Sequence, residues 1–81
     1  MSLNYEFRPL EGLSQEGQLS SLFVKDENAI CTIKKDHAPL MMMIQNGSVD
    51  LFFLDGSKQQ IQVTEGLLYC QDNLCKINVL K

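Results

Sequence analysis

The sequence predicts a small all-β domain, and three observations lead to that prediction. Turn-forming residues recur about every ten positions, apolar residues alternate with polar ones between the turns, and no segment has the periodicity of an amphipathic helix. Apolar residues make up 44% of the chain and charged residues 21%, which is typical of a folded globular protein. We therefore expect one domain over residues 1–81 with roughly seven to ten short strands and no substantial helix. The expected arrangement is a small antiparallel β-sandwich, although the strand pattern alone also permits a partly closed barrel.

The N-terminal half contains three predicted strands. Residues 4–8 place two aromatic side chains on one face, and a turn with a proline and a glycine follows. Residues 19–24 and residues 29–33 are short apolar segments separated by charged residues, as expected for the second and third strands. Pro39 stands at the first position of the next apolar segment, where a strand tolerates a residue without an N–H group.

A hairpin is predicted around the Asp-Gly pair at residues 55–56. A three-residue loop at positions 55–57 sets Leu51 opposite Ile61, so that apolar residues face each other, whereas a two-residue loop sets Leu51 against a glutamine. We therefore expect the longer loop, with Gly56 or Ser57 in a left-handed conformation.

A second hairpin is predicted around residues 72–73. A two-residue turn there pairs Cys70 with Cys75 and Leu68 with Ile77, which stacks four apolar side chains on one face. The total of three cysteines is odd and indicates a reducing compartment rather than a disulfide framework. We therefore interpret the facing cysteines as small buried thiols, close enough to form a disulfide if they are oxidised.

The segment at residues 40–44 is apolar on both faces of its predicted strand, although a two-layer β-domain buries only one. Either loops cover the second face, or a partner protein does, and methionine is well suited to such a contact. Phe52 and Leu54, on the face opposite Leu51, favour the partner slightly.

Composition and charge argue against several classes of function. Seven basic and ten acidic residues give a net charge of −3, which argues against nucleic-acid binding. The longest apolar stretch, residues 38–44, is too short to span a bilayer, and no signal-peptide pattern is present, so no direct membrane insertion is expected.

The candidate chemical groups are few. His37 is the only histidine, and no nucleophile with an adjacent base stands out. Four residues could be considered as zinc ligands, Cys31, His37, Cys70 and Cys75, but they include no C-x-x-C pair. The five glycines are scattered beside predicted turns and do not form a phosphate-binding loop. We expect no catalytic residues, no metal and no cofactor; a small redox or metal protein that uses the cysteines is a weaker alternative.

Four segments follow a pattern that one protein family shares. Residues 37–40 read H-A-P-L, with Gly47 seven positions beyond the leucine, and residues 16–24 resemble the strand G-E-V-x-S-V-x-V. The Asp-Gly loop at residues 55–56 and the stretch at residues 66–73, similar to G-G-F-L-E-V-Q-D-N, follow in the same order. Over nearly its whole length the chain resembles the N-terminal β-sandwich domain of the epsilon subunit of F-type ATP synthases.

The resemblance implies a β-sandwich that is a non-catalytic rotor subunit of the central stalk, monomeric in isolation. It also implies a peripheral location at the cytoplasmic face of the bacterial inner membrane, or the organellar equivalent. It assigns the contact with the gamma subunit to His37, Ala38, Pro39, Leu40 and Met42. It assigns the contact with the membrane rotor ring to the loop residues Asn28, Ala29 and Ile30.

The chain departs from the family pattern before the histidine. The family usually has two glycines in this run, and a proline followed by glycine or asparagine directly ahead of the histidine; here these places hold Ala29, Thr32, Lys35 and Asp36. The family's C-terminal helical hairpin has no counterpart before Lys81, so regulation through that hairpin is not expected. The alternative to a stalk subunit is a small all-β adaptor that binds a protein partner through its apolar outer faces, for example by strand addition.

Overall fold

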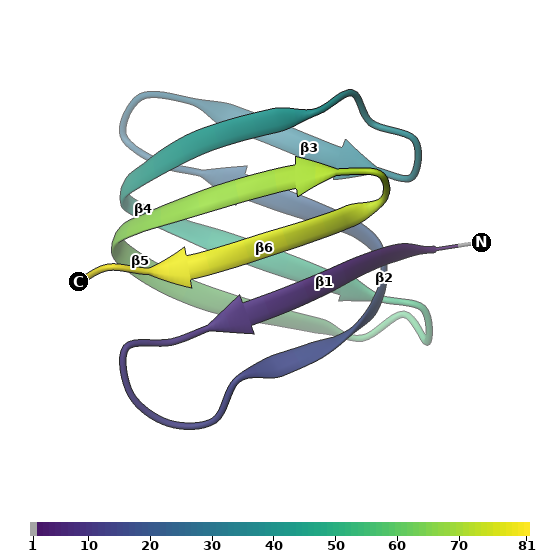
Figure 1. Cartoon of the computed structure of the whole chain (residues 1–81), viewed down its shortest axis with the longest axis horizontal. Coiled ribbons are helices and arrows are strands. Elements are labelled where there is room, and N and C mark those ends of the chain that lie inside the picture. The colour runs from purple at the N-terminus through teal and green to yellow at the C-terminus, as the bar shows by residue number, and fades with distance from the viewer. Residues whose placement is uncertain (1) are drawn as a thin grey trace.

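The computed structural model describes residues 2–81, which form six strands and no helix (Figure 1). The strands are β1 (Leu3–Arg8), β2 (Gln15–Lys25), β3 (Ile30–Lys34), β4 (Leu40–Phe53), β5 (Lys58–Gln71) and β6 (Leu74–Val79). Their order in the sheet is β1-β6-β5-β4-β2-β3, and an additional pairing of β1 with β2 closes the sheet on itself. The all-β class is therefore confirmed. No helix in the described residues could cross a membrane.

All strand pairs are antiparallel except one. β1 runs parallel to β6, with Asn4 beside Leu74 and Phe7 beside Ile77. These strands come from the two ends of the chain and no tight turn joins them, so no hairpin forces them to run in opposite directions. The expectation of antiparallel pairing is wrong at this pair and confirmed at the others.

The strands are fewer and longer than expected because three of them bend and continue. The register of β2 against β4 shifts between Leu19 and Ser21. In β4, Ile44 and Val49 are both buried although they are five residues apart, and the same is true of Val63 and Leu68 in β5. Residues an odd number apart face opposite sides of a regular strand, so both strands reverse their alternation at the bend. Each long strand thereby supplies buried side chains on both sides of its bend.

The bends in β4 and β5 depend on two glycines. A Cβ atom at Gly47 would lie 2.2 Å from the carbonyl oxygen of Lys25 and 2.6 Å from Cβ of Asp26. At Gly66 it would lie 2.8 Å from Cγ1 of Val63 and 3.0 Å from the carbonyl oxygen of Asn78 in β6. The expectation that every glycine stands beside a turn is wrong for these two and for Gly17, because all three lie inside strands. At Gly47 and Gly66 another segment also approaches closely.

The hairpin between β4 and β5 has a three-residue loop, but one position earlier than expected. The amide of Phe53 donates to the carbonyl of Ser57 at 2.9 Å, so the loop is Leu54–Gly56, and Leu51 pairs with Gln59 instead of Ile61. The Asp55 side chain accepts the Ser57 amide at 2.8 Å, which draws Ser57 into the strand pair. The register error is two residues, so the buried faces are unchanged. The left-handed conformation of Gly56 is confirmed, with φ of 90°.

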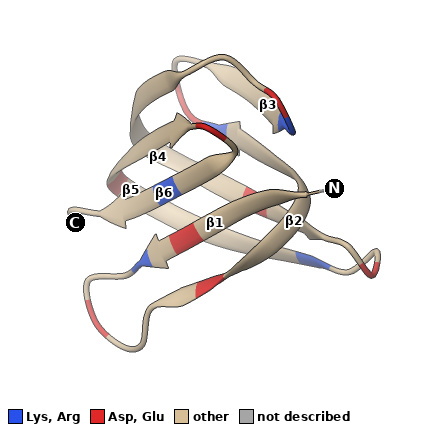
Figure 2. Cartoon of the chain, turned by 45° about the vertical axis from the view of Figure 1, so that its right-hand side comes forward, with Lys and Arg blue, Asp and Glu red and all other residues tan. Residues whose placement is uncertain are grey.

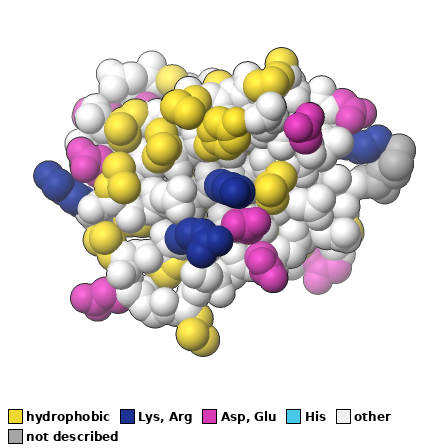
Figure 3. Space-filling model, viewed as in Figure 1, with side chains coloured by type: hydrophobic (Ala, Val, Ile, Leu, Met, Phe, Trp, Pro, Cys, Tyr) yellow, Lys and Arg dark blue, Asp and Glu magenta, His cyan; other side chains and the backbone are white. Residues whose placement is uncertain are grey.

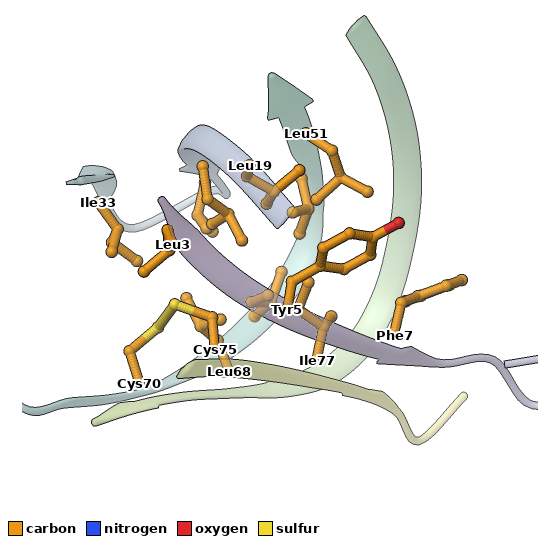
Figure 4. Close-up of a cluster of buried hydrophobic side chains, with 14 of the residues drawn as sticks. Leu3, Tyr5, Phe7, Leu19, Ile33, Leu51, Leu68, Cys70, Cys75 and Ile77 are labelled. Carbon is orange, nitrogen blue, oxygen red and sulfur yellow. A yellow bond between two sulfur atoms is a disulfide. The ribbon is translucent and has the colours of Figure 1, made fainter. Parts of the chain in front are cut away.

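The hairpin between β5 and β6 has the expected register. Asp72 and Asn73 have φ of 52° and 62°, as a two-residue turn of this kind requires, and Cys70 pairs with Cys75. Their Cα atoms are 4.1 Å apart and a disulfide joins their sulfur atoms (Figure 4). The interpretation of this pair as free thiols is therefore wrong, although both cysteines are buried as expected. Cys31 is free and half-buried.

The core lies between the two packed halves of the sheet. Figure 4 shows the disulfide beside Leu3 and Ile33 at one end, and the ring of Tyr5 near Phe7 and Ile77 at the other. The ring of Tyr5 meets that of Phe53 edge to face, with centroids 6.2 Å apart. The buried apolar residues are Leu3, Tyr5, Phe7, Leu19, Leu22, Val24, Ile33, Ile44, Val49, Leu51, Val63, Leu68, Cys70, Cys75 and Ile77.

Candidate functional site

The connection between β3 and β4 is held in place by the turn between β5 and β6. The amide of Asp36 donates to Oδ1 of Asn73 at 2.6 Å, and Nδ2 of Asn73 donates back to Oδ1 of Asp36 at 3.1 Å. The Asn73 carbonyl also accepts the amide of Asn4 at 2.8 Å. The bond from Asn73 and the nearby charge of Lys35 lower the pKa of Asp36. One asparagine thus ties together three parts of the chain.

The H-A-P-L segment begins in this fixed connection. His37, Ala38 and Pro39 are exposed, and Leu40 is half-buried against the core. The amide of His37 donates to the carbonyl of Lys34 at 3.2 Å, and Nδ1 of its ring lies 2.7 Å from the carbonyl oxygen of Ala38. The four residues therefore present a short, ordered surface at one end of the molecule.

The methionines that follow divide between the two faces of β4. Met42 is half-buried and packs against the core, whereas Met41 and Met43 are 65% and 49% exposed. Side chains two residues apart in a strand face the same side, so Met42 faces the core together with the buried Ile44. The inward direction of Met42 could therefore have been predicted from the sequence. The outward-facing apolar side chains of this segment are therefore those of Met41 and Met43.

Met41 and Met43 form a patch with residues of β5. Met41 lies opposite Tyr69 and Met43 opposite Leu67, and side chains directly opposite on one face are in contact range. We call Met41, Met43, Leu67 and Tyr69 the outer patch. Figure 3 shows hydrophobic side chains gathered on the upper half of one face, above a few basic and acidic ones. A contiguous exposed apolar surface of this kind is typical of a protein contact.

The connection between β2 and β3 is organised by Asp26. Its Oδ1 atom accepts the amides of Asn28 at 2.8 Å and Ala29 at 2.9 Å, and its Oδ2 atom accepts the amide of Gln45 at 3.0 Å. The Gln45 amide, followed by that of Asn28, lowers the pKa of Asp26. The connection is thus bound to the bend of β4, and the exposed Asn28, Ala29 and Ile30 project from it, with Ile30 67% exposed.

The two sets of predicted contact residues are well separated. β3 runs between them, with the Asn28–Ala29 connection at its start and the His37 connection at its end, and Figure 1 shows these connections at opposite ends of the molecule. In residues 2–81 no group of three or more histidine, cysteine or acidic side chains is arranged to hold a metal ion. In Figure 2 the basic and acidic residues are scattered over both strands and connections, and the basic ones lie apart from one another. Both connections expose side chains that another protein could contact, among them the apolar Ile30.

A family model matches residues 3–80: the ATP synthase, Delta/Epsilon chain, beta-sandwich domain. The chain belongs to this family.

Two solved structures share the fold of this Delta/Epsilon domain. One is a chain of the Euglena gracilis mitochondrial ATP synthase, in a structure of OSCP, F1 and the c-ring, with a TM-score of 0.85 at 13% identity. The other is from the central stalk and c-ring of the Tetrahymena thermophila mitochondrial ATP synthase, with a TM-score of 0.75 at 20% identity. The matches cover 99% and 100% of this chain but 51% and 65% of those chains. No curated protein sequence matches.

One departure from the family pattern now has a structural account. Asp36 precedes the histidine where the Delta/Epsilon family usually has glycine or asparagine, and its φ is 66°. Glycine and asparagine are the residues that adopt this left-handed conformation most readily, and aspartate is next to them. Aspartate at this position is therefore compatible with the left-handed backbone of the turn, and its side chain bonds to Asn73 in addition.

Proposed function

We propose that this Delta/Epsilon domain is part of a non-catalytic rotor subunit in the central stalk of a proton-translocating ATP synthase. The family match over residues 3–80 is the observation that carries the proposal. In this role the domain links a gamma-type subunit to the membrane rotor ring, while ATP is made in other subunits. The location that follows is peripheral, at the membrane face that carries the catalytic head.

The gamma-type subunit binds the surface formed by His37–Leu40 and the outer patch. The His37 connection is fixed by Asn73, and the adjacent patch exposes apolar area that binding would remove from water. Of the residues that the sequence assigned to this contact, His37, Ala38 and Pro39 are exposed, whereas Leu40 and Met42 support the surface from below. The side chains of Met41 and Met43 make the contact beside them.

The rotor ring binds the connection at Asn28, Ala29 and Ile30. Ile30 supplies an exposed apolar side chain, and the hydrogen bonds to Asp26 hold the connection in one shape. A loop that is already ordered loses little conformational entropy on binding, which suits a contact that must transmit torque.

The test is co-purification of the tagged chain from its own host. We expect alpha, beta and gamma subunits to be recovered with the wild-type chain, and Met43→Lys to reduce the recovery of gamma at least tenfold because a charge enters an apolar contact. Leu54→Lys is the matched control, because Leu54 is at least as exposed as Met43, at 57% against 49%, but lies in the loop between β4 and β5. Recovery of the wild-type chain alone, or equal losses in both variants, would argue against the proposal.

A further inference from the structure

The backbone of β4 has a free edge before its bend. Residues Leu40 to Gln45 pair with β5 on one side, whereas β2 pairs with β4 only from Ser48 onward. Gln45 shows which groups point to the free side: its amide donates to Oδ2 of Asp26 at 3.0 Å, and its carbonyl accepts the amide of Glu27 at 3.4 Å. The edge is therefore covered at Gln45 by the connection between β2 and β3.

The backbone groups of Met43 and Met41 point to the same side as those of Gln45. Successive residues of a strand direct their N–H and C=O groups to alternate edges. The hydrogen bonds of β5 agree with this assignment. The Glu65 carbonyl accepts the amide of Leu80 at 2.8 Å, so the odd-numbered residues of β5 bond toward β6. The even-numbered residues, such as Leu68, therefore bond toward β4, where Leu68 pairs with Met42. Within residues 2–81, Met41 and Met43 have no backbone partner on the free side.

This edge lacks the features that normally protect an exposed strand. Natural edge strands carry charged residues, prolines or bulges that prevent pairing with another chain. Residues 38–44 contain no charged residue, and Pro39 stands outside the open stretch rather than within it. β3, which also has a free edge, is only five residues long and is followed by Lys35 after its own Lys34. The open stretch of β4 is therefore suited to pairing.

We infer that an extended segment of a partner protein adds to the sheet as a strand along Met41–Met43. Two N–H and two C=O groups on alternate residues require an extended backbone of about four to five residues, which a helix cannot supply. Side chains of the added strand lie beside the exposed Met41 and Met43 on one face, and beside the half-buried Met42 on the other. The added segment is therefore uncharged and apolar on both faces.

The inference deepens the proposed function, because the same segment is proposed to face the gamma-type subunit. It depends on that function only for the identity of the partner.

The test is amide hydrogen exchange, read residue by residue, on the free chain and on the complex purified from the host. In the free chain we expect the Met41 and Met43 amides to exchange fast, and the Met42 amide slowly. In the complex we expect the Met41 and Met43 amides to exchange at least tenfold more slowly.

The outcomes separate the two proposals. Protection of Met41 and Met43 in a complex that lacks a gamma subunit supports strand addition and overturns the proposed partner. A complex with gamma in which both amides still exchange fast supports the partner and overturns strand addition. Recovery of the chain without any partner overturns both.

A pair of variants tests the backbone contact directly. Met43→Pro removes one outward N–H group, which an edge strand tolerates on its free side, whereas Met43→Leu keeps the N–H group and a side chain of similar size. We expect Met43→Pro to weaken partner binding at least tenfold and Met43→Leu to change it less than threefold, with circular dichroism as the check on folding. Equal binding by the two folded variants overturns the inference.

Discussion

At the scale of single residues, the Asp26 side chain fixes a connection outside the core. It joins the connection between β2 and β3 to the bend of β4 through three amide donors. Because these donors stabilise the charged carboxylate, the folded pKa of Asp26 lies below its ordinary value of 3.8. A depressed pKa contributes stability that is fully present well above pH 3.8 and is lost as the pH falls through the folded pKa.

We therefore expect the wild-type chain to lose thermal stability more steeply than Asp26→Asn when the pH is lowered from 6 to 2, over about the range where carboxylates titrate. Thermal unfolding at several pH values measures the difference. Glu11→Gln, in the connection between β1 and β2, is the control for the loss of one acidic group and should follow the wild type. Parallel curves for Asp26→Asn and the wild type would show that the hydrogen bonds do not depend on the charge.

The cysteines give a second prediction at this scale. When the chain is purified without reductant and unfolded with a thiol-reactive label, we expect only Cys31 to be labelled, because a disulfide joins Cys70 and Cys75. After reduction we expect all three cysteines to be labelled. Mass spectrometry counts the labels. Cys31→Ser, as the control, should take none before reduction and two after it. Three labels on the unreduced chain would show that Cys70 and Cys75 are free thiols.

At the scale of the strands, the bends in β4 and β5 decide the architecture. They allow two long strands to line both packed halves of the sheet, and Gly47 permits the close approach of β2's end at Lys25 and Asp26. Because backbone atoms surround this position, the neighbours cannot move aside as a flexible side chain could.

We expect Gly47→Ala to destabilise the domain by about 1–3 kcal/mol or more, as overpacking does in rigid surroundings. Gly17→Ala is the matched control: it also lies in a strand, but its added Cβ would meet only Cε1 of Tyr5, at an ordinary 3.4 Å. Urea unfolding of both variants makes the comparison. Similar stability of the two variants would mean that the bend relaxes easily.

At the scale of the whole molecule, the two proposed contact surfaces lie at opposite ends of β3. One contains His37 and the other contains Ile30, and β3 lies between them, paired along its length with β2. A rigid body with separate contacts at its ends can connect two partners that turn together, as the proposed role requires.

This separation predicts that one contact can be lost without the other. We expect Ile30→Lys to reduce recovery of the rotor ring at least tenfold while the gamma subunit is retained, because the substitution changes only the exposed side chain beside the Asp26 connection. Quantitative mass spectrometry of the co-purified subunits measures both partners in one sample. Thr32→Lys, an exposed β3 position closer to the middle of that strand, is the control for an added charge. Loss of both partners together would place the two contacts on one surface.

Several features of this protein could be predicted from local sequence patterns alone. Alternation and turn residues determined the all-β class, the left-handed Gly56 and the pairing of Cys70 with Cys75, because each depends on a few neighbouring residues. The resemblance identified the family, which the match over residues 3–80 confirmed. The assignments of residues to gamma and to the rotor ring stay predictions.

Other features were decided only by the tertiary structure. The bends at Gly47 and Gly66 depend on atoms distant in sequence, and the loop beside Asp55 depends on which of several similar hydrogen bonds forms. The same is true of the disulfide, the parallel pairing of β1 with β6, and the free edge at Met41–Met43. The physical reason is that the alternation of apolar residues and the chemistry of the turns specify which side of a strand faces the core. Which strand lies at each of its edges is decided only when the whole sheet closes.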